Sequence, residues 1–211
     1  MALKRRVRAS SALSLVGLVL GLVLLGAARA DTPDRASAVV KDTTDRMLQV
    51  LQKRRAEIDA RPQIIYGLVD EIVVPNFDFE RITQYAMGRF WRQADAGQRQ
   101  VLVEEFRRLL VRTYAKALLN YSGQAIRILP LRPSREGRIL VQTEINQPGG
   151  PTVPIDYQMY LKESAWKVYD VVIDGVSLVA NYRGSFAEEI RRGGIAGLIQ
   201  ALKTRNQAGN A

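Results

Sequence analysis

The stretch "WKVYDVVIDGVSLVANYRGSF", residues 166–186, joins a strand-like run to a helix-like run across a single Asp-Gly pair. Apolar side chains occupy both alternating sets of positions from Trp166 to Ile173, which predicts a strand that is covered on both faces. After Gly175 the apolar residues recur at steps of about four, the spacing of an amphipathic helix. We therefore expect a strand that ends at Asp174-Gly175 and a helix that begins directly after this turn.

Further strands are predicted upstream of this stretch, separated by short turns. A period of two residues marks them at about 126–130, 139–145 and 153–162. The last of these alternates apolar residues on one face with polar residues on the other, which is typical of a sheet with one buried face. Strands that follow one another through short turns pair in antiparallel fashion, so we expect an antiparallel sheet.

Helical spacing of apolar residues covers most of the remaining chain. Helices are predicted before the strands at about 35–60, 62–74, 78–91 and 95–121. Asp78 and Asp95 are the expected N-caps of the last two. Two more helices follow the strands, separated near Gly193-Gly194. Separate blocks of helices and strands indicate an α+β fold, in one domain over residues 31–211.

The first 30 residues have the three parts of a secretory signal peptide. "MALKRRVR" (1–8) is basic, residues 12–28 are apolar apart from Ser and Gly, and Ala28-Arg29-Ala30 offers small residues at a cleavage site. An uncleaved membrane anchor is the alternative, but the apolar run is shorter than the ~20 residues that a spanning helix needs. We expect cleavage after Ala30, which lowers the formal charge from +10 to +5 because this segment holds five basic residues and no acidic one.

The composition excludes several kinds of active site. The chain has no Cys and no His, so it offers no disulfide, no cysteine nucleophile, no histidine general base and no thiolate or imidazole zinc site. "QPGGP" (147–151) lacks the Lys and the Ser or Thr of a phosphate-binding loop, and Ser177 has no histidine to activate it. We expect no catalytic residue, no metal site and no cofactor.

One enzymatic alternative remains, and one structural alternative. Asp156-Tyr157 or Tyr169-Asp170 would combine an Asp base with a Tyr hydrogen-bond donor for proton transfer in an apolar pocket. Neighbours in a strand point to opposite faces, so only one member of each pair would face such a pocket. The two aspartates would otherwise lie on a solvated face or pair with an arginine. A purely structural adaptor is the other alternative, because apolar stripes at these spacings usually form a solid core.

The quoted stretch and its continuation to Ile199 closely resemble the C-terminal signature of the MlaC family, also called toluene-tolerance proteins. The shared features are an aromatic-led strand through "YDV", an acidic-Gly-Val-Ser turn, and "NYRGSF" leading into a helix. Similar blocks upstream are "VVPNFDFERITQYAMGRFWRQA" (73–94), "EEFRRLLVRTYAKALLNY" (104–121) and "VPIDYQM" (153–159). The resemblance covers about residues 39–202, and Asp174 stands where many members have Glu.

The resemblance implies a periplasmic phospholipid carrier of a Gram-negative bacterium. The implied fold is a curved, mostly antiparallel, nuclear-transport-factor-like sheet of four to five strands, packed with about six helices around an apolar lipid cavity. The implied partners are an inner-membrane ABC-transporter complex with its substrate-binding ring and an outer-membrane lipoprotein-porin complex, which together maintain outer-membrane lipid asymmetry. A related branch is associated with hopanoid synthesis, so a hopanoid-associated lipid binder is a further alternative. We expect a monomer that binds phospholipid, binds no nucleic acid and is not an enzyme.

We expect the acyl chains to contact the long helix, the last two long strands and the helix after Gly175. Met159 suits a variable ligand because its unbranched side chain adapts to irregular spaces. Surface arginines such as Arg89, Arg92 and Arg183 are candidates for contact with headgroups or partner proteins. The predicted lipid-binding residues are Phe106, Leu110, Tyr114, Tyr157, Met159, Leu161, Val168, Val172, Leu178, Val179 and Tyr182.

Overall fold

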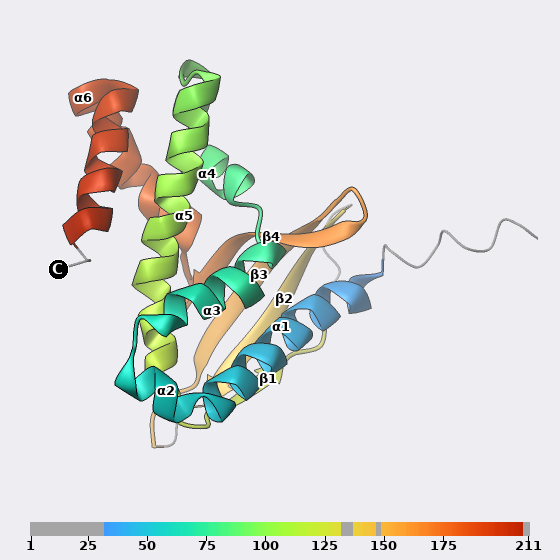
Figure 1. Ribbon diagram of the computed structural model, residues 1–211. Coiled ribbons are helices and arrows are strands. Elements are labelled where there is room, and N and C mark those ends of the chain that lie inside the picture. Colours follow the sequence, from blue (N-terminus) through green and yellow to red (C-terminus); the bar gives the residue numbers. More distant parts are fainter. Residues whose placement is uncertain (1–31, 132–136, 147–148, 209–211) are drawn as a thin grey trace, which may run out of the picture. The chain divides into compact units, whose positions relative to one another are not determined.

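The computed structural model describes residues 32–131, 137–146 and 149–208, which form six α-helices, two short 3₁₀ helices and a five-stranded sheet (Figure 1). The helices are α1 Pro33–Lys53, α2 Arg55–Ala60, α3 Ile64–Ile72, η1 Val74–Asn76, α4 Phe79–Met87, η2 Gly88–Gln93, α5 Ala96–Leu119 and α6 Leu178–Ala208. The strands are β1 Ala125–Ile128, β2 Arg138–Asn146, β3 Val153–Lys162, β4 Ala165–Ile173 and β5 Val176–Ser177. The predicted signal peptide, residues 1–30, lies outside the described residues and stays a prediction. None of the helices in the described ranges is both long and apolar enough to cross a membrane.

The sheet is antiparallel throughout, and its strand order follows the chain from β1 to β5. Its inner face is apolar: Tyr157 of β3 lies between Val141 of β2 and Val171 of β4. On the outer face Gln142 Nε2 donates to the Asp156 carboxylate at 3.3 Å. The prediction of an antiparallel sheet with one buried face is therefore confirmed.

The predicted alternation of β4 is interrupted at Tyr169. The register shifts by one residue between Gln158 and Met159 of β3, which leaves Tyr169 as an extra residue in β4, a β-bulge. Val168 and Val171 therefore belong to the same apolar cluster on the inner face of the sheet. Strict alternation predicts the opposite arrangement, with these two valines on different faces, and is wrong here.

Clusters of buried apolar residues hold the helices to one another and to the sheet. One cluster lies between α4, η2, α5 and α6, a second between α1, α2, α3 and α5, and a third between α1 and the inner face of the sheet. Ala36 and Val40 place α1 directly on that face, and Figure 1 shows this helix beside the strands. Because α1 belongs to the second and third clusters, it connects the helical part to the sheet, and α5 connects the two helical clusters.

Side-chain caps begin two of the helices as predicted. Asp78 Oδ1 accepts a hydrogen bond from the backbone N of Arg81 at 3.0 Å, at the start of α4. Asp95 and Gln98 form a capping box at the start of α5. These contacts satisfy backbone N–H groups that have no partner within the helix.

Breaks in the helices lie at Arg54 and Gly194. The apolar stripe at 35–60 predicts one helix, but the backbone of Arg54 (φ −108°, ψ 18°) separates α1 from α2. The two predicted C-terminal helices are segments of α6 on either side of Gly194, whose φ of 67° and ψ of −169° are accessible essentially to glycine alone. The α+β prediction, with four to five strands and about six helices, is confirmed.

Candidate functional site

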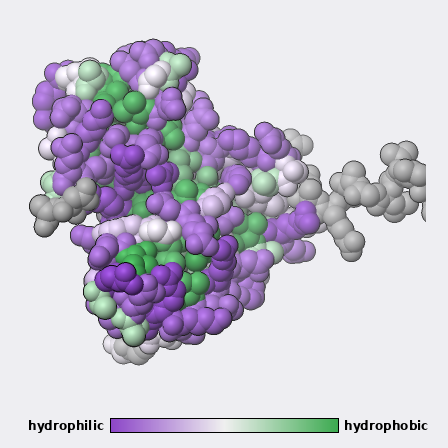
Figure 2. Space-filling view, in the orientation of Figure 1, coloured by the Kyte–Doolittle hydropathy of each residue, from purple (hydrophilic) through white to green (hydrophobic). Residues whose placement is uncertain are grey.

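A cavity of about 580 Å³ lies where α1, the segment between α3 and α4, α5 and the inner face of the sheet meet. Protein interiors contain few voids larger than a water molecule, whereas sites for small ligands measure ~300–1,000 Å³. The volume is therefore that of a ligand site and not of a packing defect. On the face drawn in Figure 2, hydrophobic surface is visible in a hollow between hydrophilic regions.

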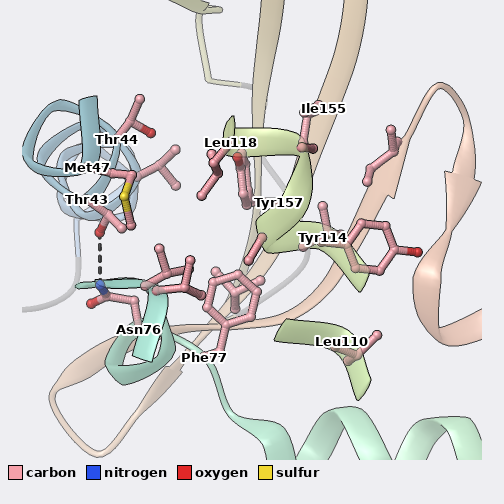
Figure 3. A pocket seen from close by; sticks show the side chains of 18 of the residues that line it. Thr43, Thr44, Met47, Asn76, Phe77, Leu110, Tyr114, Leu118, Ile155 and Tyr157 are labelled. Atoms are coloured by element: carbon pink, nitrogen blue, oxygen red, sulfur yellow. Dashed lines mark hydrogen bonds between the residues drawn. The ribbon is translucent and has the colours of Figure 1, made fainter. Parts of the chain in front are cut away.

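Helices α1 and α5 supply much of the lining, each from a stripe of residues at helical spacing. Positions three and four residues apart share one face of a helix, so each stripe presents a continuous surface to the cavity. Phe77 of the segment between α3 and α4 and Ile155 and Tyr157 of β3 complete the view in Figure 3. The labelled helical residues are Thr43, Thr44 and Met47 of α1 and Leu110, Tyr114 and Leu118 of α5.

The polar side chains between α1 and η1 are satisfied by partners within the protein. Asn76 Nδ2 donates to Thr43 Oγ1 at 2.9 Å (Figure 3) and to the carbonyl oxygen of Ile72 at 3.2 Å. Thr43 Oγ1 donates in turn to the carbonyl oxygen of Val39 at 2.6 Å. These bonds tie α1 to η1 and leave the cavity wall largely apolar at this point.

Among the described residues that line the cavity, Asp170 alone carries a charge. Its carboxylate accepts hydrogen bonds from Ser177 Oγ at 2.6 Å and from the backbone N of Val179 at 3.1 Å. Gln158 Nε2 is a third donor, at 3.3 Å. Ser177 Oγ also accepts from the backbone N of Ala180 at 3.0 Å. Asp170 and Ser177 together therefore cap the start of α6.

The members of both Asp-Tyr pairs considered for proton transfer are engaged in separate contacts. Tyr157 lines the cavity, whereas Asp156 bonds to Gln142 on the outer face. Asp170 caps α6, whereas Tyr169 packs edge-on against another tyrosine, Tyr160, at 5.8 Å between ring centroids. Neither pair brings a free carboxylate and a phenol together on the cavity wall. The described residues also contain no group of three or more Asp or Glu side chains suited to hold a metal ion.

The hydroxyl of Tyr157 is desolvated by its surroundings. Burial raises the pKa of Tyr157 to about 12. Part of its side chain nevertheless stays accessible, because that part faces the cavity. The phenol is thus a neutral hydrogen-bond donor at any physiological pH.

The structure places six of the predicted lipid-binding residues on the cavity wall and five elsewhere. Contact of any of them with lipid stays a prediction. Those on the wall are Leu110, Tyr114, Tyr157, Val168, Leu178 and Val179. Those elsewhere are Phe106 and Tyr182 in the cluster between α4, α5 and α6, Met159 and Leu161 in the cluster beneath α1, and Val172 opposite Asp156 on the outer face.

The α1 wall of the cavity was not predicted to belong to the site. The stripe of α1 carries threonines at Thr43 and Thr44 between apolar positions, so it is less apolar than a helix buried in a solid core requires. Such small polar residues on an otherwise buried helical face were the sequence signal that could have indicated a cavity wall. The segment at 73–77, which also lines the cavity, carried no comparable signal because its residues follow no regular period.

A cavity of this size with an almost uncharged lining defines a class of protein. An α+β domain that keeps such a space among apolar and aromatic side chains is a binding protein for an apolar ligand. The family model described as "MlaC protein" matches residues 41–204 of the chain. The chain therefore belongs to the MlaC family, as the resemblance implies.

Relatives of known name or structure agree with this assignment. The toluene tolerance protein ttg2D of Pseudomonas putida is 29% identical over 157 residues, which are 74% of this chain and 73% of the relative. The intermembrane phospholipid transport system binding protein MlaC of Haemophilus influenzae is 24% identical over 169 residues, 78% of this chain and 79% of the relative. A phospholipid-binding protein from Ralstonia solanacearum, solved in complex with a phospholipid, superposes with a TM-score of 0.77 at 38% identity, covering 83% of this chain and 99% of that one.

Proposed function

We propose that the protein is a periplasmic phospholipid carrier that holds the acyl chains of its cargo in the cavity. The observation that carries this proposal is the cavity of about 580 Å³ with its nearly uncharged lining. The phospholipid bound by the Ralstonia solanacearum relative and the name of the Haemophilus influenzae relative support the choice of ligand.

The energetics of lipid transfer explain why such a carrier needs no catalytic group. At about 0.8 kcal/mol per buried CH₂, exposing two acyl chains with about 30 methylenes to water costs roughly 24 kcal/mol. A cavity that replaces the bilayer interior removes most of this cost. Binding and release are sufficient for the function, and the relatives' names likewise describe binding, transport and tolerance.

We propose further that the carrier exchanges lipid with membrane complexes on both sides of the periplasm. The expected partners are an inner-membrane ABC-transporter complex with its substrate-binding ring and an outer-membrane lipoprotein-porin complex. The intermembrane transport named for the Haemophilus influenzae relative and the predicted signal peptide at 1–30 support this proposal. The outcome would be maintenance of lipid asymmetry in the outer membrane.

Native mass spectrometry tests the carrier function directly. The full chain is expressed in a Gram-negative host, so that its N-terminal segment can direct export, and is purified without added lipid. We expect an intact mass that corresponds to cleavage after Ala30 and additional masses that match bound phospholipid. A protein that is reproducibly free of lipid, or that stays uncleaved in the cytoplasm, would contradict the proposal.

A pair of glutamate substitutions near the start of α6 shows where the lipid binds. Leu178 lines the cavity, whereas Val176, two residues earlier, is 57% exposed. We expect Leu178→Glu to abolish lipid retention, because a carboxylate in an apolar space is costly to desolvate, and Val176→Glu to leave it unchanged. Circular dichroism of both variants separates lipid loss from unfolding. Unfolding of Leu178→Glu would place this residue in the solid core.

A further inference from the structure

Tyr157 presents a hydroxyl group at the centre of a largely apolar surface. It lies on the middle strand of the sheet, directly between Val141 and Val171. The residues two positions away along β3, Ile155 and Met159, share its face and are also apolar. Three of these neighbouring side chains have no hydrogen-bond acceptor, and the fourth, Met159, offers only a weakly accepting thioether sulfur.

The other hydroxyl on this face has a partner, and Tyr157 does not. Thr143 Oγ1 donates to the carbonyl oxygen of Ile155 at 2.9 Å. Among the described residues no hydrogen bond is formed by Tyr157 Oη, and the raised pKa of Tyr157 has desolvation as its only cause. Buried tyrosine hydroxyls usually find a partner, because an unmade hydrogen bond costs free energy. Figure 3 places Tyr157 among the cavity-lining side chains, so a ligand can supply the acceptor.

We propose that Tyr157 Oη donates a hydrogen bond to an ester carbonyl oxygen of the bound lipid. The inference rests on the proposed carrier function. Acyl chains offer no acceptor, and a charged headgroup is too costly to desolvate in a cavity without cationic side chains. The ester carbonyl is the neutral acceptor that adjoins the chains. Tyr157 thus selects ester-linked lipids and sets how deeply the glycerol backbone enters the cavity.

Competition between an ester-linked and an ether-linked lipid tests this contact. The probes are phosphatidylglycerol with ester-linked chains and its dialkyl ether analogue with chains of equal length, offered together to lipid-depleted protein. Native mass spectrometry measures the ratio of the two complexes. We expect the wild-type protein to prefer the ester by about 3- to 10-fold, the range of a single neutral hydrogen bond. Tyr157→Phe should bind the two lipids equally.

Tyr66→Phe is the matched control, because it removes a hydroxyl from a half-buried tyrosine of α3 that is not among the residues lining the cavity. We expect this variant to keep the wild-type preference for the ester. Lipid-depleted Tyr157→Phe should be at least as stable as wild type, since the lost hydroxyl has no partner in the protein.

Each outcome of the competition decides between the two proposals. Equal binding of both lipids by the wild-type protein would overturn the ester contact and leave the carrier function standing, whatever the variant does. Loss of the preference in Tyr66→Phe as well, or its retention in Tyr157→Phe, would contradict a specific contact of Tyr157 Oη with the ester. Failure of wild type to bind either lipid would contradict the carrier function itself.

Discussion

Single buried carboxylates join segments that are distant in the sequence. Asp78 is 7% exposed and accepts hydrogen bonds from the Tyr160 hydroxyl, from Lys162 Nζ at 2.9 Å and from the backbone N of Arg81. Burial alone would raise the pKa of Asp78, but these hydrogen bonds outweigh it and lower the pKa below its ordinary value. The sequence predicted Asp78 as an N-cap. It did not predict that Asp78 attaches α4 to the end of β3, because its partners Tyr160 and Lys162 lie 82 and 84 positions further along the chain.

Asp78→Asn should lower the free energy of unfolding by about 1–3 kcal/mol at pH 7, because three donors lose a charged acceptor. The folded-state pKa lies below the unfolded value of about 3.9, so the contribution is complete above that pH and is lost as the pH falls through the folded pKa. Urea unfolding followed by circular dichroism should therefore show a constant difference between wild type and variant from about pH 5 to pH 7, and a smaller one below about pH 4.

The matched control for this experiment is Asp95→Asn. Asp95 caps α5 at an exposed position, and Asn is about as good an N-cap as Asp. We expect little change in stability from this substitution. Equal losses in both variants, or a loss in Asp78→Asn that does not depend on pH, would contradict the role given to the buried carboxylate.

Periodicity predicted the helices and strands, but it did not predict which residues of every strand lie on the inner face of the sheet. Three helical boundaries had local signals: two aspartate caps and one pair of glycines. The bulge at Tyr169 had none, because the residues around it are apolar in both alternating sets and one extra residue leaves no visible change of pattern. The faces of β4 therefore follow from pairing with β3 and could not be predicted from the strand alone.

The break in α6 allows a test of backbone strain. Gly194 has a positive φ of 67°, and no positive φ occurs at the neighbouring Gly193. A Cβ added at either position meets no atom within 4 Å, so the two substitutions differ only in backbone strain. We expect Gly194→Ala to destabilise the protein by about 1–3 kcal/mol and Gly193→Ala to be neutral or to stabilise it by up to about 1 kcal/mol. Thermal unfolding measures both, and equal shifts would show that the backbone at Gly194 is not constrained.

The apolar pattern of the sequence predicted buried stripes but not the empty space among them. Phe106 and Leu110 are one turn apart on α5, yet Phe106 packs against Phe186 at 4.8 Å between ring centroids whereas Leu110 lines the cavity. Both positions carry apolar residues at helical spacing, because a side chain that fills the core and a side chain that lines a cavity are both apolar. Which one occurs depends on how several elements meet, and that arrangement has no local sequence signal.

The proposed lipid is expected to contribute to the stability of the whole fold. A ligand that binds only the folded state stabilises it by RT ln(1 + [L]/Kd), about 2.7 kcal/mol at 100 times Kd. Extraction of lipid should therefore lower the Tm, and added phosphatidylglycerol should restore it. Glycerol phosphate, which has no acyl chains, is the control and should have no effect. A Tm that is independent of phosphatidylglycerol would mean that the cavity does not bind it.

The bulge in β4 already accommodates one extra residue, so this strand is sensitive to a further insertion more than to exchange of its residues. Deleting Tyr169 would restore regular alternation and keep Val171 and Ile173 facing the cavity, whereas one more residue inserted at this position would turn both of them away from it. Such an insertion would also change the distance along the chain from Trp166 to the residues that cap α6. Exchanges among apolar residues keep both features. During evolution this strand is thus open to apolar substitution and to loss of the bulge residue, and closed to a further insertion.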